Sequence, residues 1–217
     1  MIIPCFREGL RTLFFRCTIA KQCGMMVLMD KKYLMVIDLE ATCFERGSEP
    51  EGWFQEIIEV GLVLLASQTL EIVETHQQFV KPVLFPELSP FCKGLTTISQ
   101  SQADGGISFR SEMSYLSELY ADYNRPMFFS FGKYDYNQIL RQCNRFKVDF
   151  PFRLEQHVNI KQAFNKLYNK NFFRGVPHKY ALKFFNVSIE GTHHRALDDA
   201  LTISKFLVKM VKDGLKY

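Results

Sequence analysis

Two carboxylates, one residue apart, close the apolar segment YLMVIDLEATC at residues 33–43. Side chains alternate along a strand, so Asp38 and Glu40 point to the same face at or just beyond a strand end. Two like charges this close repel each other, and partial burial increases the repulsion. A divalent cation would offset it, since carboxylate oxygens are the ligands that Mg²⁺ and Mn²⁺ prefer. The pair alone has a simpler interpretation, in which Asp38 caps the strand and Glu40 points into water.

Two later segments supply acids that could join this pair. Asp135 follows a short apolar strand and lies at the start of a helix. A negative charge at this position also stabilises the helix through its dipole. In HRALDDALTISKFLVKM, helical spacing separates two adjacent aspartates. Asp198 shares a polar stripe of the helix, whereas Asp199 lines up with Ile203 and Phe206 on the apolar face. An inward-facing acid needs a partner, so we expect Asp199 to be functional and Asp198 to lie on the surface.

His194 lies five residues before Asp199, at the N-terminal end of the same predicted helix. A neutral imidazole there could accept a proton from an attacking water, because histidine titrates near neutral pH. A lone histidine is more often structural, and the neighbouring His193 could be confused with it. The four acids around it make His194 the candidate general base.

The alternation of apolar and polar residues predicts the elements that must position these side chains. Strands are expected at 33–39, 56–67, 70–82, 127–131 and the start of 158–170. Helices are expected at 108–124, 134–146, the rest of 158–170, 178–186 and 194–214. The first three strands form an antiparallel meander, and helices and strands alternate after it. This order predicts an α/β sandwich around one mixed sheet.

Length and composition favour an ordinary globular protein. A chain of 217 residues, 47% hydrophobic and 23% charged, suits one domain with a sizeable core. Its apolar runs fall short of the roughly 18 residues of a membrane span, so we expect no membrane association. The six cysteines are scattered without a CxxC pair, which argues against a structural zinc site and for a reduced intracellular compartment. We therefore expect a cytoplasmic protein.

Residues 1–29 differ from the rest of the chain. Arg7, Arg11, Arg16 and Lys21 face a single acid, Glu8, and no hydrophobic period persists. Basic residues interrupt every apolar core that a signal peptide would need. We interpret this stretch as an N-terminal extension, either a peripheral tail or a segment before a later start, with an organellar presequence as an alternative. Residues 30–217 are expected to form a single domain.

Charge is distributed unevenly around a formal net charge of +4. Residues 40–124 hold thirteen acids against four bases, whereas residues 125–183 hold twelve Lys and Arg against three acids. Aromatic residues such as Phe172 and Tyr180 interrupt this basic block. Such a block could attract phosphates while its aromatics stack on unpaired bases. A solvated helical surface above core aromatics is the more common explanation.

The order Asp38-x-Glu40, then Asp135, then His194-x4-Asp199 resembles the DEDDh family of 3′ to 5′ exonucleases, which share the ribonuclease H-like fold. The resemblance covers about residues 31–217. The segments VIDLEATC, QEIIEVGLVLL, LSPFCKGLTTISQSQ and HRALDDALTISKFLVKMVKDG look most like the histone-mRNA-type and sporulation-inhibitor-type exoribonucleases. The resemblance implies a central mixed sheet of about five strands, flanked by helices. Three strands of this sheet form an antiparallel meander, and the others are parallel.

The resemblance also implies an exoribonuclease that removes nucleotides from single-stranded RNA or RNA 3′ overhangs as nucleoside 5′-monophosphates. We expect the protein to be a monomer. Asp38, Glu40, Asp135 and Asp199 would hold two Mg²⁺ ions, with Mn²⁺ as a substitute, and His194 would be the general base. A single-stranded DNA exonuclease of the same chemistry is an alternative. An inactive nucleic-acid-binding regulator is another, although none of the five expected side chains is missing.

By the same resemblance, a set of six residues would contact the terminal nucleotide: Leu39, Ala41, Thr42, Leu95, Thr96 and Tyr134. The subgroup often has an aromatic residue where Leu39 stands and a tryptophan where Tyr134 stands. These departures bear on base stacking and nucleotide preference.

Overall fold

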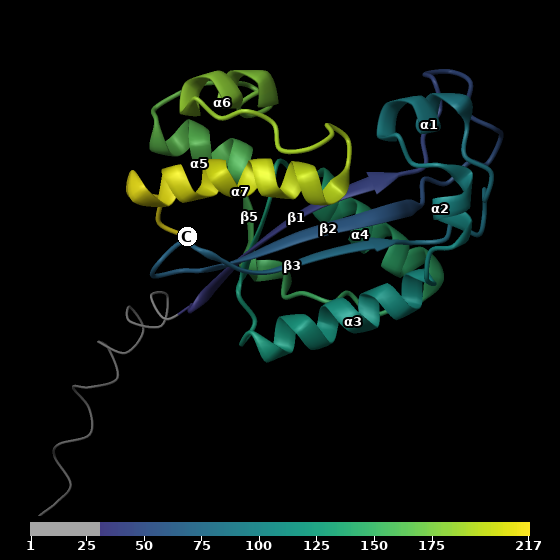
Figure 1. Ribbon diagram of the computed structural model, residues 1–217, viewed down its shortest axis with the longest axis horizontal. Coiled ribbons are helices and arrows are strands. Elements are labelled where there is room, and N and C mark those ends of the chain that lie inside the picture. Colours follow the sequence, from purple (N-terminus) through teal and green to yellow (C-terminus); the bar gives the residue numbers. More distant parts are fainter. Residues whose placement is uncertain (1–30) are drawn as a thin grey trace, which may run out of the picture. The chain divides into compact units, whose positions relative to one another are not determined.

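A five-stranded mixed sheet runs through the middle of the protein (Figure 1). The computed structural model describes residues 31–217, so the predicted extension over residues 1–29 lies outside the described part. The strands are β1 (Tyr33–Ala41), β2 (Ile57–Ala66), β3 (Ile72–Phe79), β4 (Met127–Ser130) and β5 (His157–Asn159). Their spatial order is β3-β2-β1-β4-β5.

Strand pairing confirms the predicted meander followed by parallel strands. β1 is antiparallel to β2, and β2 is antiparallel to β3. On its other side β1 is parallel to β4, which is parallel to β5. β1 extends to Ala41, so Asp38 and Glu40 belong to the paired strand, opposite Gly61 and Glu59 of β2.

Helices cover both faces of the sheet (Figure 1). They are α1 (Pro90–Thr96), α2 (Gln100–Asp104), α3 (Phe109–Asp122), α4 (Tyr134–Phe146), α5 (Ile160–Leu167), α6 (His178–Phe185) and α7 (Ala196–Lys212). α3 and α4 lie on one face, α5 to α7 lie on the other, and α1 and α2 lie at the end toward which β1 runs. No helix within residues 31–217 combines the length and apolarity needed to cross a bilayer.

The two faces of β1 enter two separate hydrophobic cores. Met35 and Ile37 belong to the core beneath α3 and α4, whereas Leu34 and Val36 belong to the core beneath α5 to α7. Because side chains alternate along a strand, Asp38 continues the second of these rows, as does Glu40. Both carboxylates therefore point toward the α7 layer.

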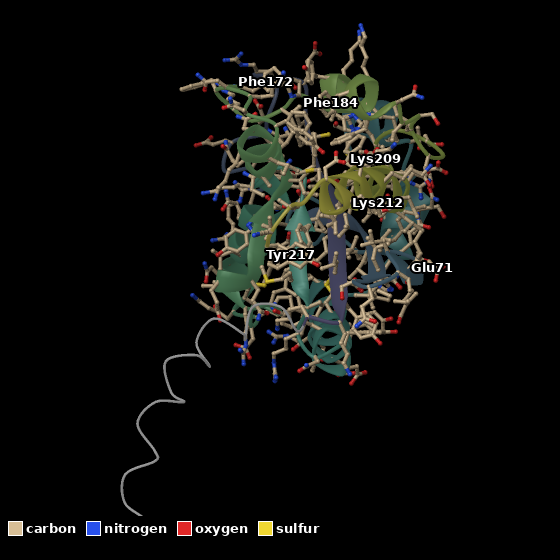
Figure 2. The ribbon with its side chains drawn as sticks, turned by 90° about the vertical axis from the view of Figure 1, so that its left-hand side faces the viewer. Glu71, Phe172, Phe184, Lys209, Lys212 and Tyr217 are labelled. Carbon is tan, nitrogen blue, oxygen red and sulfur yellow. The ribbon has the colours of Figure 1, made fainter. Side chains whose placement is uncertain are left out.

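The end of the molecule where α7 finishes faces the viewer in Figure 2, with Lys209 and Lys212 labelled on that helix. The chain turns beneath α7 after it ends, and Tyr217 returns to the sheet. Its ring meets Phe129 of β4 edge-on at a centroid distance of 5.6 Å. The C-terminal end of the chain therefore packs against the sheet below the end of α7.

Candidate active site

One pocket of about 330 Å³ contains all five residues predicted to be catalytic. They come from three places in the fold: β1 carries Asp38 and Glu40, the start of α4 carries Asp135, and the start of α7 carries Asp199 with His194 in the preceding loop. Because β1 and β4 are parallel, the residues that end β1 and those that follow β4 meet at one edge of the sheet.

Three of the carboxylates form a compact group. Oxygens of Asp38, Glu40 and Asp199 all lie within 4.8 Å of one another. Burial, followed by the charges of Asp199 and Glu59, raises the pKa of Glu40 to about 8. Burial and the charge of Asp135 raise the pKa of Asp38 well above its ordinary value. The repulsion inferred from the sequence is thus present in the folded protein, and a cation would relieve it.

Asp135 lies outside this group of three but lines the same pocket. Its side chain is 5% exposed, and burial raises its pKa to about 7. Hydrogen bonds from the backbone N–H groups of Asp135 itself and Leu39, and the positive charge of Lys161, act in the opposite direction. Asp135 therefore adds a buried fourth carboxyl group to the pocket.

Asp199 offers a free oxygen to the pocket. The residue is 8% exposed, and its Oδ2 accepts the backbone N–H of His194 at 3.0 Å. Its Oδ1 is buried without a hydrogen-bond partner among the described residues. A buried acceptor without a partner is costly, and a metal ion is a suitable partner for it.

His194 lies beside the carboxylates with its ring partly exposed. Its Nδ1 is 4.0 Å from Glu40 Oε1. Burial and the neighbouring His193 lower the pKa of His194 from its ordinary value. The imidazole is therefore neutral at neutral pH and can accept a proton.

Asp198 corrects the expectation of a surface role, because it is half-buried beneath the loop that precedes α7. Its Oδ2 accepts the backbone N–H of Thr192 at 2.7 Å, and its backbone carbonyl accepts the Thr202 hydroxyl at 3.0 Å. Thr202, four residues further along the helix, is fully buried, and its hydroxyl accepts the backbone N–H of Glu190. This side of α7 holds the loop that presents His194.

An ion pair that the sequence analysis missed fixes the start of α7. Glu59 of β2 is fully buried and accepts from Arg195 at 2.8 Å and from the backbone N–H of Ala196 at 3.0 Å. A Cβ on Gly61 would lie 2.1 Å from the backbone of Ala196, so helix and strand meet backbone to backbone. The sequence could have predicted this ion pair, because an acid inside the apolar run EIIEVGLVLL needs a buried partner.

The six residues proposed for nucleotide binding divide into two groups. Leu39, Ala41, Leu95 and Tyr134 line the pocket, and Leu95 and Tyr134 are exposed. The structure does not bring the other two, Thr42 and Thr96, to the pocket lining. The Thr42 hydroxyl accepts the backbone N–H of Glu56, and the Thr96 hydroxyl donates to the Cys92 carbonyl. Both residues are buried. Their hydroxyl groups already form hydrogen bonds within the protein.

Other pocket residues gave no signal in the sequence. Gln55 comes from the loop before β2, Phe131 follows β4, and His178 opens α6. The His178 ring meets Phe131 edge-on at 5.3 Å, and burial lowers its pKa to about 4. A single histidine at the start of a short helix does not reveal that it faces a site formed elsewhere.

Most aromatic residues of the basic block pack in or against the core, which agrees with the interpretation of this block as a solvated helical surface above core aromatics. Phe152 and Phe164 are buried, and Phe172 packs partly buried against the core beneath α5 to α7. Phe173, at 95% exposed, and the exposed Tyr180 are exceptions.

Comparison with known proteins identifies relatives of the whole described region. Residues 35–207 match the model of a protein family described as "Exonuclease". The human protein named 3′-5′ exoribonuclease 1 is 33% identical over 194 residues, which is 84% of this chain and 53% of that protein. The probable 3′-5′ exonuclease KapD of Bacillus subtilis is 32% identical over 189 residues, covering 87% of this chain and 89% of KapD. The chain thus spans about half the length of the mammalian exoribonuclease 1 relatives.

Solved structures agree with these relatives. The nuclease domain of 3′hExo, described as a DEDDh family member bound to rAMP, has a TM-score of 0.76 at 29% identity, covering 87% of this chain and 96% of that one. A 3′-exonuclease structure described as recognising the histone mRNA stem-loop has a TM-score of 0.74 at 28% identity, covering 86% and 84%. The predicted ribonuclease H-like fold is therefore confirmed, and by its sequence match and its fold the chain belongs to the exonuclease family.

Proposed function

We propose that this protein is a divalent-metal-dependent 3′-5′ exoribonuclease that removes nucleoside 5′-monophosphates from RNA 3′ ends. The observation that carries the proposal is the meeting of Asp38, Glu40 and Asp199 within 4.8 Å, beside a histidine with a lowered pKa. The raised pKa values of the acids and the unpartnered Asp199 Oδ1 fit a site that receives cations.

The proposed ion ligands are those that the family resemblance implies, and the grouping of Asp38, Glu40 and Asp199 supports them. Asp38 would contact both of two Mg²⁺ or Mn²⁺ ions, with Glu40 and Asp199 on one side and Asp135 on the other. When bound, the ions polarise the phosphate and stabilise the leaving 3′ oxygen. Asp38 and Glu40 lie on the rigid central strand, so the sheet sets the positions of their oxygens, whereas α4 and α7 set the positions of Asp135 and Asp199.

His194 would supply the proton transfer. As a neutral imidazole it takes the proton of the attacking water, and its partly exposed ring can pass that proton to solvent. The backbone N–H of His194 is held by Asp199 Oδ2. This bond fixes the backbone from which the imidazole reaches the attacking water.

The terminal nucleotide would enter between Leu95 on α1 and Tyr134 on α4, both of which line the pocket and are exposed. Leu39 and Ala41 form the buried floor of that entrance. RNA is the preferred substrate in this proposal because the human relative is named an exoribonuclease and a structural neighbour is described with bound rAMP. Single-stranded RNA or a 3′ overhang fits an open pocket, and a cytoplasmic monomer is the accompanying expectation.

The test is degradation of 5′-end-labelled RNA and DNA of one sequence, with Mg²⁺, Mn²⁺ or EDTA. We expect the RNA to shorten from its 3′ end with either metal and to remain intact in EDTA, and the Asp38→Ala variant should leave it intact throughout. If DNA is consumed while RNA is spared, the substrate class is DNA. If wild type is no more active than Asp38→Ala, the protein is a binding module.

A further inference from the structure

A second group of potential metal ligands lies beside the three carboxylates, and it contains two imidazoles. Ligand atoms of His193, His194 and Asp199 all lie within 4.8 Å of one another. Imidazole nitrogen suits Zn²⁺, whereas an all-carboxylate group suits Mg²⁺ and Mn²⁺. The two groups share Asp199 but differ in the ion that they favour.

The loop before α7 brings the two imidazoles together. His194 has φ +63°, which is uncommon for a residue other than glycine. In an extended chain two adjacent side chains would point to opposite faces. Here the rings of His193 and His194 meet with centroids 4.0 Å apart and planes at 80°. The hydrogen bond from the backbone of His194 to Asp199 holds this conformation.

Asp199 supplies a ligand atom that is ready to bind. The residue is more than nine-tenths buried, and its Oδ1 has no hydrogen-bond partner among the described residues. On the other side of the group, His193 is exposed, which gives an ion access from solvent. The group therefore joins a fixed buried oxygen to an accessible nitrogen.

We propose that His193, His194 and Asp199 form an inhibitory Zn²⁺ site, in which two nitrogens and one oxygen bind the ion and water completes a tetrahedral shell. Zinc binds such ligands at about 2.0–2.2 Å, so the three atoms must close from their present separation, and the exposed His193 side chain can turn to do this. Zinc also binds nitrogen ligands more tightly than Mn²⁺ does. The site uses no cysteine and differs from the structural zinc sites that the sequence argues against.

The inhibitory effect rests on the proposed function. An ion bound to His194 occupies the imidazole nitrogen that would accept the proton of the attacking water. The same ion takes an oxygen of Asp199 away from the carboxylate group. Zinc would thus stop hydrolysis even when Mg²⁺ is abundant.

Binding is tested first, without any nuclease assay. The full chain is stripped with EDTA, exchanged into metal-free buffer and titrated with Co²⁺, which reports tetrahedral binding by its visible absorption, and with Zn²⁺ by calorimetry. We expect His193→Ala to lose about 10–100-fold in affinity, as for other disrupted zinc sites, and His76→Gln, outside the site, to match wild type. The His193→Cys variant should regain binding and add a thiolate-to-cobalt absorption band that wild type lacks.

Inhibition is tested second, on labelled RNA at fixed Mg²⁺ with increasing Zn²⁺, each rate divided by that variant's rate without zinc. His193→Ala should need about 10–100-fold more Zn²⁺ than wild type for half inhibition, following the loss of affinity. Equal inhibition of both would place zinc on the carboxylates alone and overturn the inference, as would equal Co²⁺ binding by both. If the protein has no nuclease activity, the proposed function fails while the Co²⁺ and calorimetric results still decide the zinc site.

Discussion

At His194, burial lowers the pKa of an imidazole that lies beside Glu40, with Nδ1 and Oε1 4.0 Å apart. A general base works only when it is neutral, so activity should rise with pH through a pKa below the ordinary histidine value of about 6.5 and level off above it. The nearby carboxylates have raised pKa values, but metal binding keeps them ionised.

The His194→Ala variant should lose about 10²–10⁴-fold in kcat, and its remaining activity should lack the rise with pH. Mg²⁺ binding, followed by calorimetry, should persist because the four carboxylates are intact. His76→Gln is the matched control for the loss of an imidazole outside the pocket. Equal rates for His194→Ala and wild type across the acidic range would remove His194 from the mechanism.

The Asp38→Asn variant should separate catalysis from stability. Removing one of the crowded negative charges relieves repulsion, so metal-free Asp38→Asn should melt at a higher temperature than metal-free wild type at pH 8. It should also lose nuclease activity and the rise in Tm that Mg²⁺ produces in wild type. The exposed Asp122 at the end of α3 provides the control substitution Asp122→Asn. A lower Tm for metal-free Asp38→Asn would show that the charge stabilises the fold.

At the scale of elements, the site depends on how closely α7 approaches β2. Gly61 allows the backbones to touch, and the buried pair of Glu59 and Arg195 ties the first residues of α7 to the strand. His194 and Asp199 lie on either side of this attachment. The helix start, more than any contact inside the pocket, therefore sets the separation of the acids.

Gly61→Ala should destabilise the protein by about 1–3 kcal/mol, because an added methyl group has to push the helix backbone away. The free energy of unfolding from urea titration measures this, and the rate of RNA decay should fall as Asp199 moves from Asp38. Gly94→Ala in α1 is the matched control, since a Cβ there meets no atom within 4 Å. Unchanged stability for Gly61→Ala would show that the helix can shift freely.

Arg195→Ala should be more damaging, because it leaves Glu59 buried without its cation. Breaking a buried pair in this way costs about 3–5 kcal/mol. The exposed pair of Lys205 on α7 and Glu190 in the preceding loop gives the comparison, as Lys205→Ala should change the unfolding free energy by about 0–1 kcal/mol. Similar losses for the two variants would contradict the anchoring role of Arg195.

The sequence predicts elements better than it predicts these attachments. The order and type of the strands and the longer helices follow from apolar periodicity, and the inward position of Asp199 follows from its place on the apolar face of α7. The half-buried position of Asp198 and the internal hydrogen bonds of Thr42 and Thr96 do not follow from the sequence. Each depends on a loop or strand distant in the chain, whose position is set only by the complete tertiary packing.

For the whole molecule, the raised pKa values link stability, pH and metal. A carboxyl group with a raised folded pKa stabilises the native state below its unfolded pKa, and this contribution is lost as pH rises through the folded value. That value is about 8 for Glu40 and about 7 for Asp135. The lowered pKa values of His157 and His178 act in the opposite direction, but only below the unfolded histidine pKa of about 6.5.

The Tm of metal-free protein should therefore fall between about pH 6.5 and 8.5, the interval above the histidine range in which these carboxyls ionise. Mg²⁺ should raise Tm more at the upper end, because only the ionised carboxylates bind it. Thermal melts in EDTA and in Mg²⁺ across this interval measure both effects. A Mg²⁺-induced rise in Tm that is equal at both ends would contradict the link.

The attachment of α7 to the first strands also sets an order in time. A ribosome makes the N-terminal part first, at about 5–20 residues per second, so Asp199 is synthesised on the order of ten seconds after Asp38. A growing chain that lacks α7 holds an incomplete group of carboxylates, and its His194 lacks the hydrogen bond to Asp199. If the protein has the proposed nuclease activity, we expect that activity to begin only after α7 has emerged and docked. Ribosome-bound chains arrested before α7 should leave added RNA intact, and degradation by them would contradict this order of assembly.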